Sequence, residues 1–149
     1  MPLPARLGLL SLHRLSLKVV KRVVVCGSTT FPITPEIGGE VVDLLREYPE
    51  DTVFLTRGSP GFDHFIRRAT ELIGLPCVVY PSPGGSGNWD RDVAMVRDAD
   101  EVLVFYDPAS LNNMNTGTAH VTEKALDQKK PTRAWTVANN QLVYAGSQP

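Results

Sequence analysis

Residues 23–28 read VVVCGS, a continuous apolar run that is closed by a glycine and a serine. Such a run is typical of a strand that is buried on both faces, as the strands of parallel sheets are. Further runs of this kind follow along the chain, at residues 52–56, 77–80, 101–106 and 134–137. The sequence therefore predicts a sheet built from short, buried strands.

Stretches with apolar residues at helical spacing separate these runs. They cover about residues 35–48, 62–73, 88–97 and 118–128. Pro35 suits the first turn of a helix, and Gly74 suits the position just after one. The alternation predicts an α/β fold: a Rossmann-like, doubly wound three-layer sandwich with a mostly parallel five-stranded sheet. Residues 142–144 are a possible further edge strand.

Length and composition predict one domain. A chain of 149 residues with 42% hydrophobic content can enclose one sizeable core, which we assign to residues 22–149. The formal net charge of -1 provides no overall field for binding a long polyanion. Nucleic acid is therefore not expected as a partner.

Residues 1–21 form a basic, leucine-rich extension before the predicted domain. The stretch before Glu36 contains five Lys and Arg residues and no acidic residue. It can be a surface-lying amphipathic segment, an organelle-targeting leader or an extension upstream of the folded start, and we favour the extension. Its apolar runs are too short for a membrane-spanning helix, so the sequence predicts a soluble protein with no membrane partner.

Cysteine and histidine usage indicates no metal site. Cys26 and Cys77 each lie inside an apolar run, where a free cysteine packs as a small hydrophobic residue. Neither has a CxxC partner, and His64 and His120 have no Asp or Cys at a spacing that indicates a triad or a metal site. The sequence predicts no metal, no cofactor and a reduced, cytoplasmic location.

Small residues follow three of the predicted strands, at residues 27–30, 58–61 and 116–118. In open parallel sheets the ligand crevice lies beyond the carboxyl ends of the strands, where helix N-termini favour anions. Glycine lets a ligand approach the backbone, and Ser or Thr adds a hydroxyl donor. The alternative is that these turns need glycine for structural reasons alone. The candidate ligand-binding residues in the three loops are Gly27, Ser28, Thr29, Gly58, Ser59, Gly61, Gly117 and Thr118.

Arg57 and Arg91 are placed to neutralise a phosphate at this edge, and Trp89 is placed to stack on a base. For Arg91 the alternative is an ion pair with Asp90 or Asp92 at the start of the helix. For Trp89 the alternative is packing in the core. The chain contains neither GxGxxG nor GxxxxGK[ST], so it predicts no dinucleotide fingerprint and no P-loop.

Asp63, Asp92 and Asp107 are the candidate catalytic carboxylates near the same edge. Cleavage of an N-glycosidic bond needs a carboxylate at the reacting carbon and a group that protonates the leaving base. For Asp63 the alternative is a helix cap, and Asp107 with Pro108 is also an ordinary turn opener. Glu123 lies a full turn into its helix, so we expect it to face solvent.

Four segments of the chain read VVVCGSTTF (23–31), LTRGSPGFDHFIRRA (55–69), WDRDVAM (89–95) and NTGTAHVTEKAL (115–126). In this order they resemble the SLOG superfamily, which groups the DNA-processing DprA/Smf proteins with the cytokinin-activating LOG enzymes, and within it the small YspA-like branch. The resemblance implies a Rossmann-like fold that binds nucleotides or nucleotide-derived ligands, and a homodimer paired through helices. The site residues that it implies are Gly27, Ser28, Gly58, Gly61, Asp63, Arg91, Gly117 and Thr118.

Two positions depart from the family patterns. LOG enzymes carry PGGxGTxxE, whereas residues 112–115 here read NNMN and Val121 stands where the glutamate would be. YspA-like members show Arg-Asn where this chain has Arg91 and Asp92. The first departure removes the acid expected for N-glycosidic hydrolysis.

The sequence thus favours a module that binds a nucleotide or nucleotide-derived phosphorylated ligand at the carboxyl ends of the parallel strands. The alternative is an N-glycoside-processing enzyme, either a LOG-like nucleoside monophosphate phosphoribohydrolase or a nucleoside deoxyribosyltransferase. A third possibility, DNA binding by analogy with DprA, is supported only by the basic opening of the chain.

Overall fold

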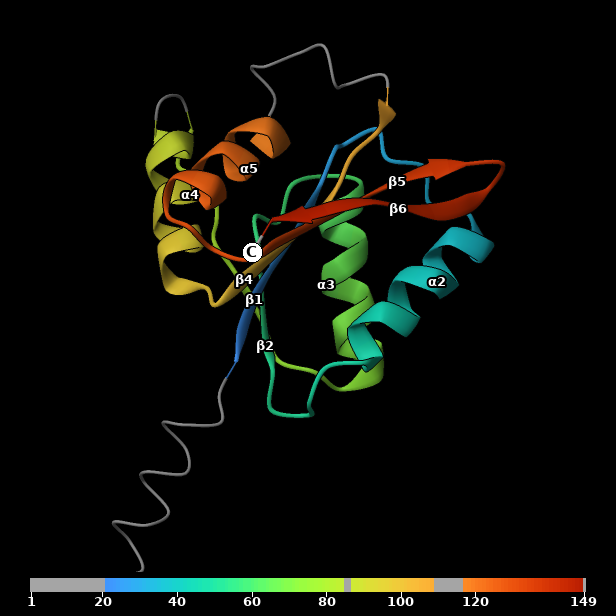
Figure 1. Cartoon of the computed structure of the whole chain (residues 1–149). Coiled ribbons are helices and arrows are strands. Elements are labelled where there is room, and N and C mark those ends of the chain that lie inside the picture. The colour runs from blue at the N-terminus through green and yellow to red at the C-terminus, as the bar shows by residue number, and fades with distance from the viewer. Residues whose placement is uncertain (1–20, 85–86, 109–116, 149) are drawn as a thin grey trace, which may run out of the picture.

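The computed structural model of the chain describes residues 21–84, 87–108 and 117–148. Its strands are β1 (Arg22–Gly27), β2 (Val53–Thr56), β3 (Cys77–Val79), β4 (Glu101–Phe105), β5 (Thr132–Ala138) and β6 (Gln141–Gln148). Its helices are α2 (Pro35–Arg46), α3 (Phe62–Ile73), α4 (Gly87–Asp98) and α5 (Gly117–Asp127). Figure 1 shows the sheet between α2 and α3 on one side and α4 and α5 on the other. The predicted Rossmann-like, doubly wound α/β fold is confirmed.

All the strands form one sheet, in the order β3-β2-β1-β4-β5-β6. β1 to β5 run parallel, and β6 runs antiparallel to β5. The chain moves outward from β1 through β2 to β3 and then returns to β4, on the other side of β1. The sheet therefore has its topological switch point between β1 and β4, where a ligand crevice is expected at the carboxyl ends of the strands.

The sheet has six strands rather than the predicted five, because residues 141–148 pair with β5 as a full strand. Asn139 and Asn140 connect β5 to β6, and both have positive φ, at 53 and 56 degrees. Two consecutive residues with positive φ make a tight hairpin turn, and asparagine tolerates this conformation better than most residues. The short apolar run at 142–144 indicated only the middle of this strand.

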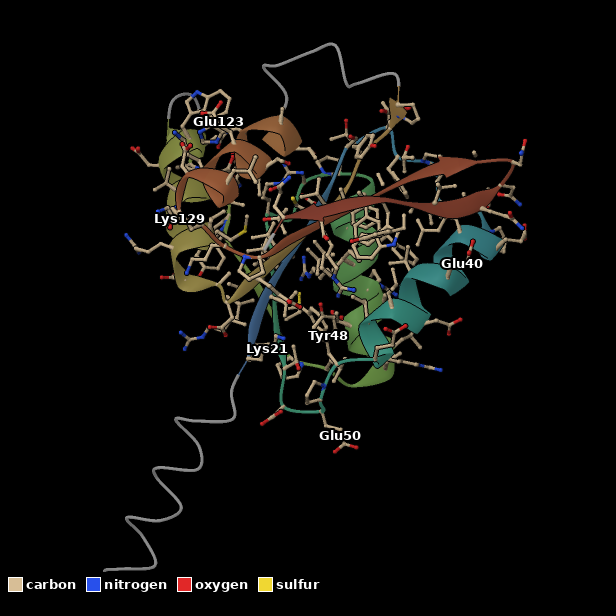
Figure 2. All side chains as sticks on the ribbon, viewed as in Figure 1. Lys21, Glu40, Tyr48, Glu50, Glu123 and Lys129 are labelled. Atoms are coloured by element: carbon tan, nitrogen blue, oxygen red, sulfur yellow. The ribbon has the colours of Figure 1, made fainter. Side chains whose placement is uncertain are left out.

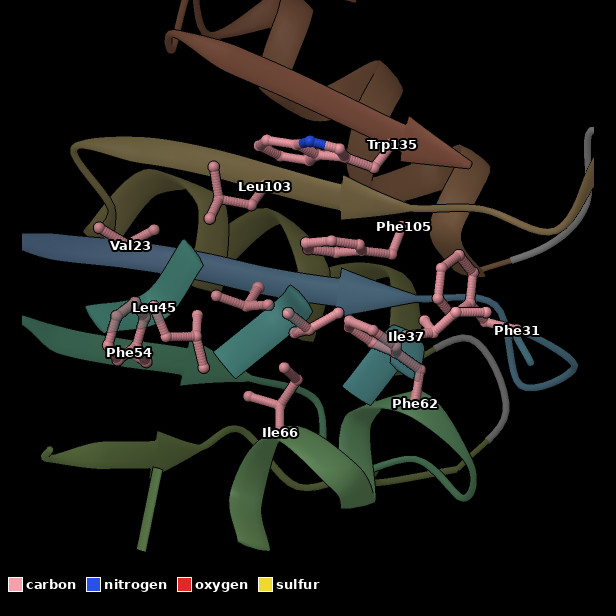
Figure 3. Packing of buried hydrophobic residues seen from close by; sticks show 12 residues of the cluster. Val23, Phe31, Ile37, Leu45, Phe54, Phe62, Ile66, Leu103, Phe105 and Trp135 are labelled. Carbon is pink, nitrogen blue, oxygen red and sulfur yellow. The ribbon is translucent and has the colours of Figure 1, made fainter. Parts of the chain in front are cut away.

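Aromatic rings fill the layer between the sheet and helices α2 and α3. Phe105 stacks on Trp135 with ring centroids 5.0 Å apart, and on Phe62 with centroids 4.7 Å apart. Phe31 meets the Phe62 ring edge-on at 5.1 Å. Figure 3 shows this row of rings across the strands, and all four side chains are buried. Phe62 therefore belongs to the core.

Smaller, aliphatic side chains fill the layer between the sheet and helices α4 and α5. Cys26 and Val104 of the strands pack here with Met95 and Val121 of the helices. Burial raises the pKa of the Cys26 thiol to about 12. Cys26 is therefore buried, as the sequence predicted, and the raised pKa keeps its thiol protonated at neutral pH.

Several charged side chains lie at the periphery of the fold. Figure 2 shows Glu50, Glu123 and Lys129 directed away from the sheet, and all three are exposed. The exposure of Glu123 confirms the prediction for that residue. Within the described part of the chain, no helix is long and apolar enough to cross a membrane.

Candidate functional site

The candidate site lies at the carboxyl ends of β1 and β4. Gly27 at the end of β1 pairs with Phe105 at the end of β4. Beyond the strands, the N–H of Ser28 donates to the Phe105 carbonyl at 2.9 Å, and the N–H of Asp107 donates to Ser28 Oγ at 3.2 Å. The hydroxyl of Thr30 donates to Asp107 Oδ2 at 2.7 Å. The loops that follow β1 and β4 are thus joined at the switch point.

A buried ion pair lies beside these loops. Arg57 Nε donates to Asp63 Oδ2 at 2.9 Å, and the two side chains are only 5% and 0% exposed. Asp63 Oδ1 accepts from the N–H of Gly27 at 3.1 Å, and the N–H of Ser59 also donates to this carboxylate. Arg57 Nη2 donates to the Gly27 carbonyl at 2.7 Å. The pair therefore ties the ends of β1 and β2 to the start of α3.

Burial and neighbouring charges change the pKa values of both members of this pair. Burial alone would lower the pKa of Arg57, but its neighbours, first the thiolate form of Cys26 and then Asp63 and Asp92, outweigh burial and raise that pKa. Burial raises the pKa of Asp63, against the opposing effect of Arg57 and of its backbone donors. The guanidinium and two N–H groups all donate to the carboxylate, and these hydrogen bonds favour its ionised form.

The Arg57 guanidinium also reaches the first turn of α5. Nη2 lies 3.4 Å from the hydroxyl of Thr118, and a Cβ on Gly117 would overlap Nη1. Nη1 makes no hydrogen bond to any residue that the structure describes. The N–H groups of a first helical turn have no partners within their own helix. Glycine at position 117 therefore lets a guanidinium N–H lie beside the start of α5.

Contacts inside the protein account for the glycines of the first two loops. A Cβ on Gly27 would lie 2.5 Å from the Phe62 ring, and a Cβ on Gly61 would overlap the Thr29 carbonyl. Gly58 and Gly61 also have positive φ, at 74 and 82 degrees, which favours glycine. The structural explanation for these glycines, that the turns themselves need glycine, therefore holds for Gly27, Gly58 and Gly61.

The backbone donors at the start of the first loop are used within the protein. The N–H of Gly27 donates to Asp63, and the N–H of Ser28 donates to Phe105. Thr29, which the sequence also placed at the site, is exposed, as is Thr30. A ligand beside this loop would therefore contact the two threonines rather than the N–H groups of Gly27 and Ser28.

Asp92 forms the centre of a second buried cluster, between α4 and α5. It is 1% exposed, its Oδ1 accepts from Arg91 Nε at 2.7 Å, and its Oδ2 lies 3.1 Å from His120 Nδ1. Arg91 Nη1 donates to the Tyr80 carbonyl at 3.1 Å. Trp89 meets His120 with ring centroids 3.9 Å apart. The alternative considered for Arg91, an ion pair with Asp92, is therefore present.

The three candidate catalytic acids have different surroundings. Asp63 and Asp92 are buried and bonded within the protein, whereas Asp107 is only partly buried. Asp63 is not a helix cap, because Gly61 holds the N-cap position of α3 and no side chain caps that helix. Its carboxylate reaches back to β1 instead. The first two acids thus support the loops from within, and Asp107 lies among the loops themselves.

His120 is the residue of this region that sequence reasoning missed. Its partner Asp92 lies 28 residues earlier, on another helix, so no sequence spacing could pair them. The available signal was that both residues fall near the starts of helices that follow predicted loops. Such residues meet when the two helices pack side by side on one face of the sheet, as α4 and α5 do (Figure 1).

Other features of the described residues do not compete with this site. Among them, no group of three or more His, Cys, Asp or Glu side chains could hold a metal ion. Surface grooves lie against α2, one lined in part by Ile33 and Phe65 and another by Leu44 and Tyr144. No residue of α5 lines either groove. The candidate site is therefore defined by its hydrogen bonds and charges rather than by a groove.

In comparisons with known proteins, no family model matches this chain, and no curated protein matches it. The resemblance to the SLOG superfamily, and the homodimer that it implies, therefore stay predictions from the four quoted segments.

Proposed function

We propose that the protein binds the phosphate group of a nucleotide or nucleotide derivative between the loop after β1 and the start of α5. The observation that supports this most is the position of Arg57. Its Nη1 lies where a Cβ of residue 117 would be, and it makes no hydrogen bond to the described residues. A guanidinium N–H beside the N-terminus of a helix is a favourable arrangement for an anion.

Hydroxyl groups around the same point add further donors. Thr118 lies in the first turn of α5 with its hydroxyl 3.4 Å from Arg57 Nη2. Thr29 and Thr30 are exposed on the loop after β1, which hydrogen bonds join to the loop after β4. Phosphate oxygens accept from hydroxyl, guanidinium and backbone N–H groups alike. The donors around this point are therefore of the types that bind phosphate oxygens.

Thermal unfolding of phosphate-free protein with nucleoside monophosphates, ADP-ribose and inorganic phosphate tests the proposal. A ligand that binds only the folded state raises the unfolding temperature, and the stabilisation grows with the logarithm of its concentration over Kd. We expect stabilisation by at least one phosphorylated compound. The absence of stabilisation by all of them would contradict the proposal.

A matched pair of variants on α5 localises the binding. Thr118→Val removes the hydroxyl beside Arg57. It should raise the Kd by about tenfold, the usual effect of losing a hydrogen bond to a charged group. Thr122→Val removes a hydroxyl that bonds to the Thr118 carbonyl one turn further along, and it should leave Kd unchanged. Equal Kd values for the two variants, measured by calorimetry, would place the ligand elsewhere.

The alternative of an N-glycoside-processing enzyme depends on Asp107. Bonds within the protein hold Asp63 and Asp92, whereas Asp107 is partly buried beside the switch point and bonded to Thr30. Release of free base from nucleoside monophosphates, lost in Asp107→Asn and kept in the exposed control Asp51→Asn, would support this activity. Unchanged release in both variants would rule out the role of Asp107.

A further inference from the structure

Trp89 and His120 form an aromatic pair at the starts of α4 and α5. Their ring centroids lie 3.9 Å apart, with 68 degrees between the ring planes. Trp89 is 40% exposed, which is unusual for so large an aromatic side chain, and the His120 side chain is 12% exposed. His120 therefore covers part of the indole and leaves the rest open.

The buried carboxylate of Asp92 orients the imidazole of His120. A carboxylate only accepts hydrogen bonds, so the contact of 3.1 Å to Nδ1 places the proton of a neutral imidazole on Nδ1. The lone pair of such an imidazole is then on Nε2. Within the described residues no hydrogen bond to Nε2 is found. The pair thus combines an open aromatic surface with an oriented hydrogen-bond acceptor.

Charge in this cluster is balanced without a ligand. The guanidinium of Arg91 is bonded to Asp92 at 2.7 Å, so the single carboxylate of the cluster already has a cationic partner. Neither an added cation nor an added anion is therefore needed to compensate the cluster. Its exposed chemistry suits a neutral, planar group that can stack and donate a hydrogen bond.

His120 lies close to the proposed phosphate position. It follows Gly117 by three residues on α5, which corresponds to about 4.5 Å along the helix axis. One nucleotide can place its phosphate at the first residue of a helix and its base near the end of the first turn. The aromatic pair and the helix start are therefore close enough for one ligand.

We infer that Trp89 and His120 bind the heteroaromatic base of the nucleotide: the base stacks on the indole and donates an N–H to His120 Nε2. Asp92 is a positioning residue, because it acts on the base only through the imidazole. The inference rests on the proposed phosphate site, and it commits that site to nucleotides rather than to free phosphate or sugar phosphates.

Binding of three compounds with a common phosphate tests the inference: AMP, ribose 5-phosphate and inorganic phosphate. Calorimetry should give AMP a Kd at least about fivefold below that of ribose 5-phosphate, because stacking on an aromatic side chain adds roughly 1–3 kcal/mol per base. Trp89→Ala should raise the Kd of AMP about tenfold and leave the Kd of the two other compounds unchanged.

Fluorescence reports on the indole directly. Trp89 and Trp135 are the two tryptophans of the chain, and Trp135 is 5% exposed within the aromatic layer. In a Trp135→Phe background, AMP should quench the emission of Trp89, and ribose 5-phosphate should not. Equal quenching by both compounds would overturn the inference.

Variants of the histidine and its carboxylate test the hydrogen bond. His120→Ala should weaken AMP binding and leave ribose 5-phosphate binding unchanged. In Asp92→Asn, an amide N–H facing Nδ1 would move the imidazole proton to Nε2, so AMP binding should weaken while ribose 5-phosphate binding stays. Far-ultraviolet circular dichroism and urea unfolding check that both variants are folded.

Three negative results are possible, and they have different meanings. If AMP and ribose 5-phosphate bind equally tightly and Trp89→Ala affects neither, the base subsite is wrong and the phosphate site stands. If neither these three compounds nor the other nucleoside monophosphates and ADP-ribose bind, the proposed function is wrong and the base subsite falls with it. Equal weakening of all three compounds by Trp89→Ala would also overturn the subsite, because it would show a general structural effect.

Discussion

The two layers that flank the sheet are built from different chemistry. The layer under α2 and α3 contains stacked and edge-on rings, among them Phe62, Phe105 and Trp135. Among the described residues, the buried side chains of the layer under α4 and α5 include no aromatic ring. Buried charged groups lie beside this layer at the carboxyl ends of the strands, where Arg57 and Asp92 contact α5. One layer is packed with aromatic rings, and the candidate site lies at the start of α5, where Arg57 also bonds to Asp63 of α3.

The difference shows how the fold separates stability from binding. Aromatic rings bury large apolar areas and need few polar partners, so the α2–α3 layer can be fully packed. Buried charges cost free energy unless each has a partner, and replacing them by apolar residues is often neutral or stabilising. The paired charges at the carboxyl ends of the strands, Arg57 with Asp63 of α3 and Arg91 with Asp92 of α4, are therefore weak evidence for stability.

Breaking the buried ion pair should have the largest effect on stability. Asp63→Ala leaves the guanidinium of Arg57 without its carboxylate in a buried position. We expect a loss of about 3–5 kcal/mol in the free energy of unfolding, measured by urea denaturation. Asp43→Ala, which removes an exposed carboxylate from α2, is the control and should change stability by less than about 0.5 kcal/mol. A small loss in Asp63→Ala would show that the pair is not needed to join the strands to α3.

Adding a single methyl group at the end of β1, against the aromatic layer, should have a smaller effect. A Cβ on Gly27 would lie 2.5 Å from the Phe62 ring and 2.9 Å from the Phe105 carbonyl. Gly27→Ala should therefore cost about 1–3 kcal/mol in the free energy of unfolding, as overpacking does. Gly39→Ala is the matched control, because a Cβ there meets no atom within 4 Å and the residue is exposed on α2. It should stabilise the protein by about 0.5–1 kcal/mol.

Raising the pH should weaken the aliphatic layer through Cys26. Burial raises the pKa of this thiol from 9.0 to about 12, so the unfolded chain loses the proton at a lower pH than the folded protein does. The stability contributed by the protonated thiol is present below pH 9.0 and is lost as the pH rises toward about 12. Between pH 9 and 10 the loss from this group should be about 1 kcal/mol.

Comparison of the wild-type protein with Cys26→Ala isolates this effect. Urea unfolding at pH 7, 9 and 10 should show a shallower decline in the variant, because other groups titrate in both proteins. Equal declines would show that Cys26 ionises as easily in the folded state as in the unfolded chain.

Much of the fold could be predicted from local patterns. Helix α3 has the predicted bounds, since Gly61 and Gly74 with positive φ mark its two ends. β6 was predicted only in part, because its apolar run is short and the hairpin turn is Asn-Asn rather than the more recognisable Asn-Gly. Elements with a clear pattern over a few residues can thus be predicted from the sequence. The extent of an element with a weak pattern, such as β6, is decided by pairing with the neighbouring strand.

The candidate site could be predicted in place but not in its connections. The loops after β1, β2 and β4 were expected at one edge, and the bonds from Arg57 to Gly27 and Thr118 show that they meet there. The sequence did not predict which contacts each side chain makes at that edge. Asp63 was considered as a cap of its own helix, and its carboxylate bonds to the end of β1 instead, 36 residues earlier in the chain.

The amino-acid sequence by itself determined the order of strands and helices and the edge at which the small residues gather. These properties follow from hydrophobic periodicity and from glycine and proline, which act over a few residues. The tertiary structure alone decided which charges pair: Arg57 with Asp63, and Asp92 with Arg91 and His120. The physical reason is that hydrogen bonds and ion pairs depend on distances between side chains, and packing of distant segments sets those distances.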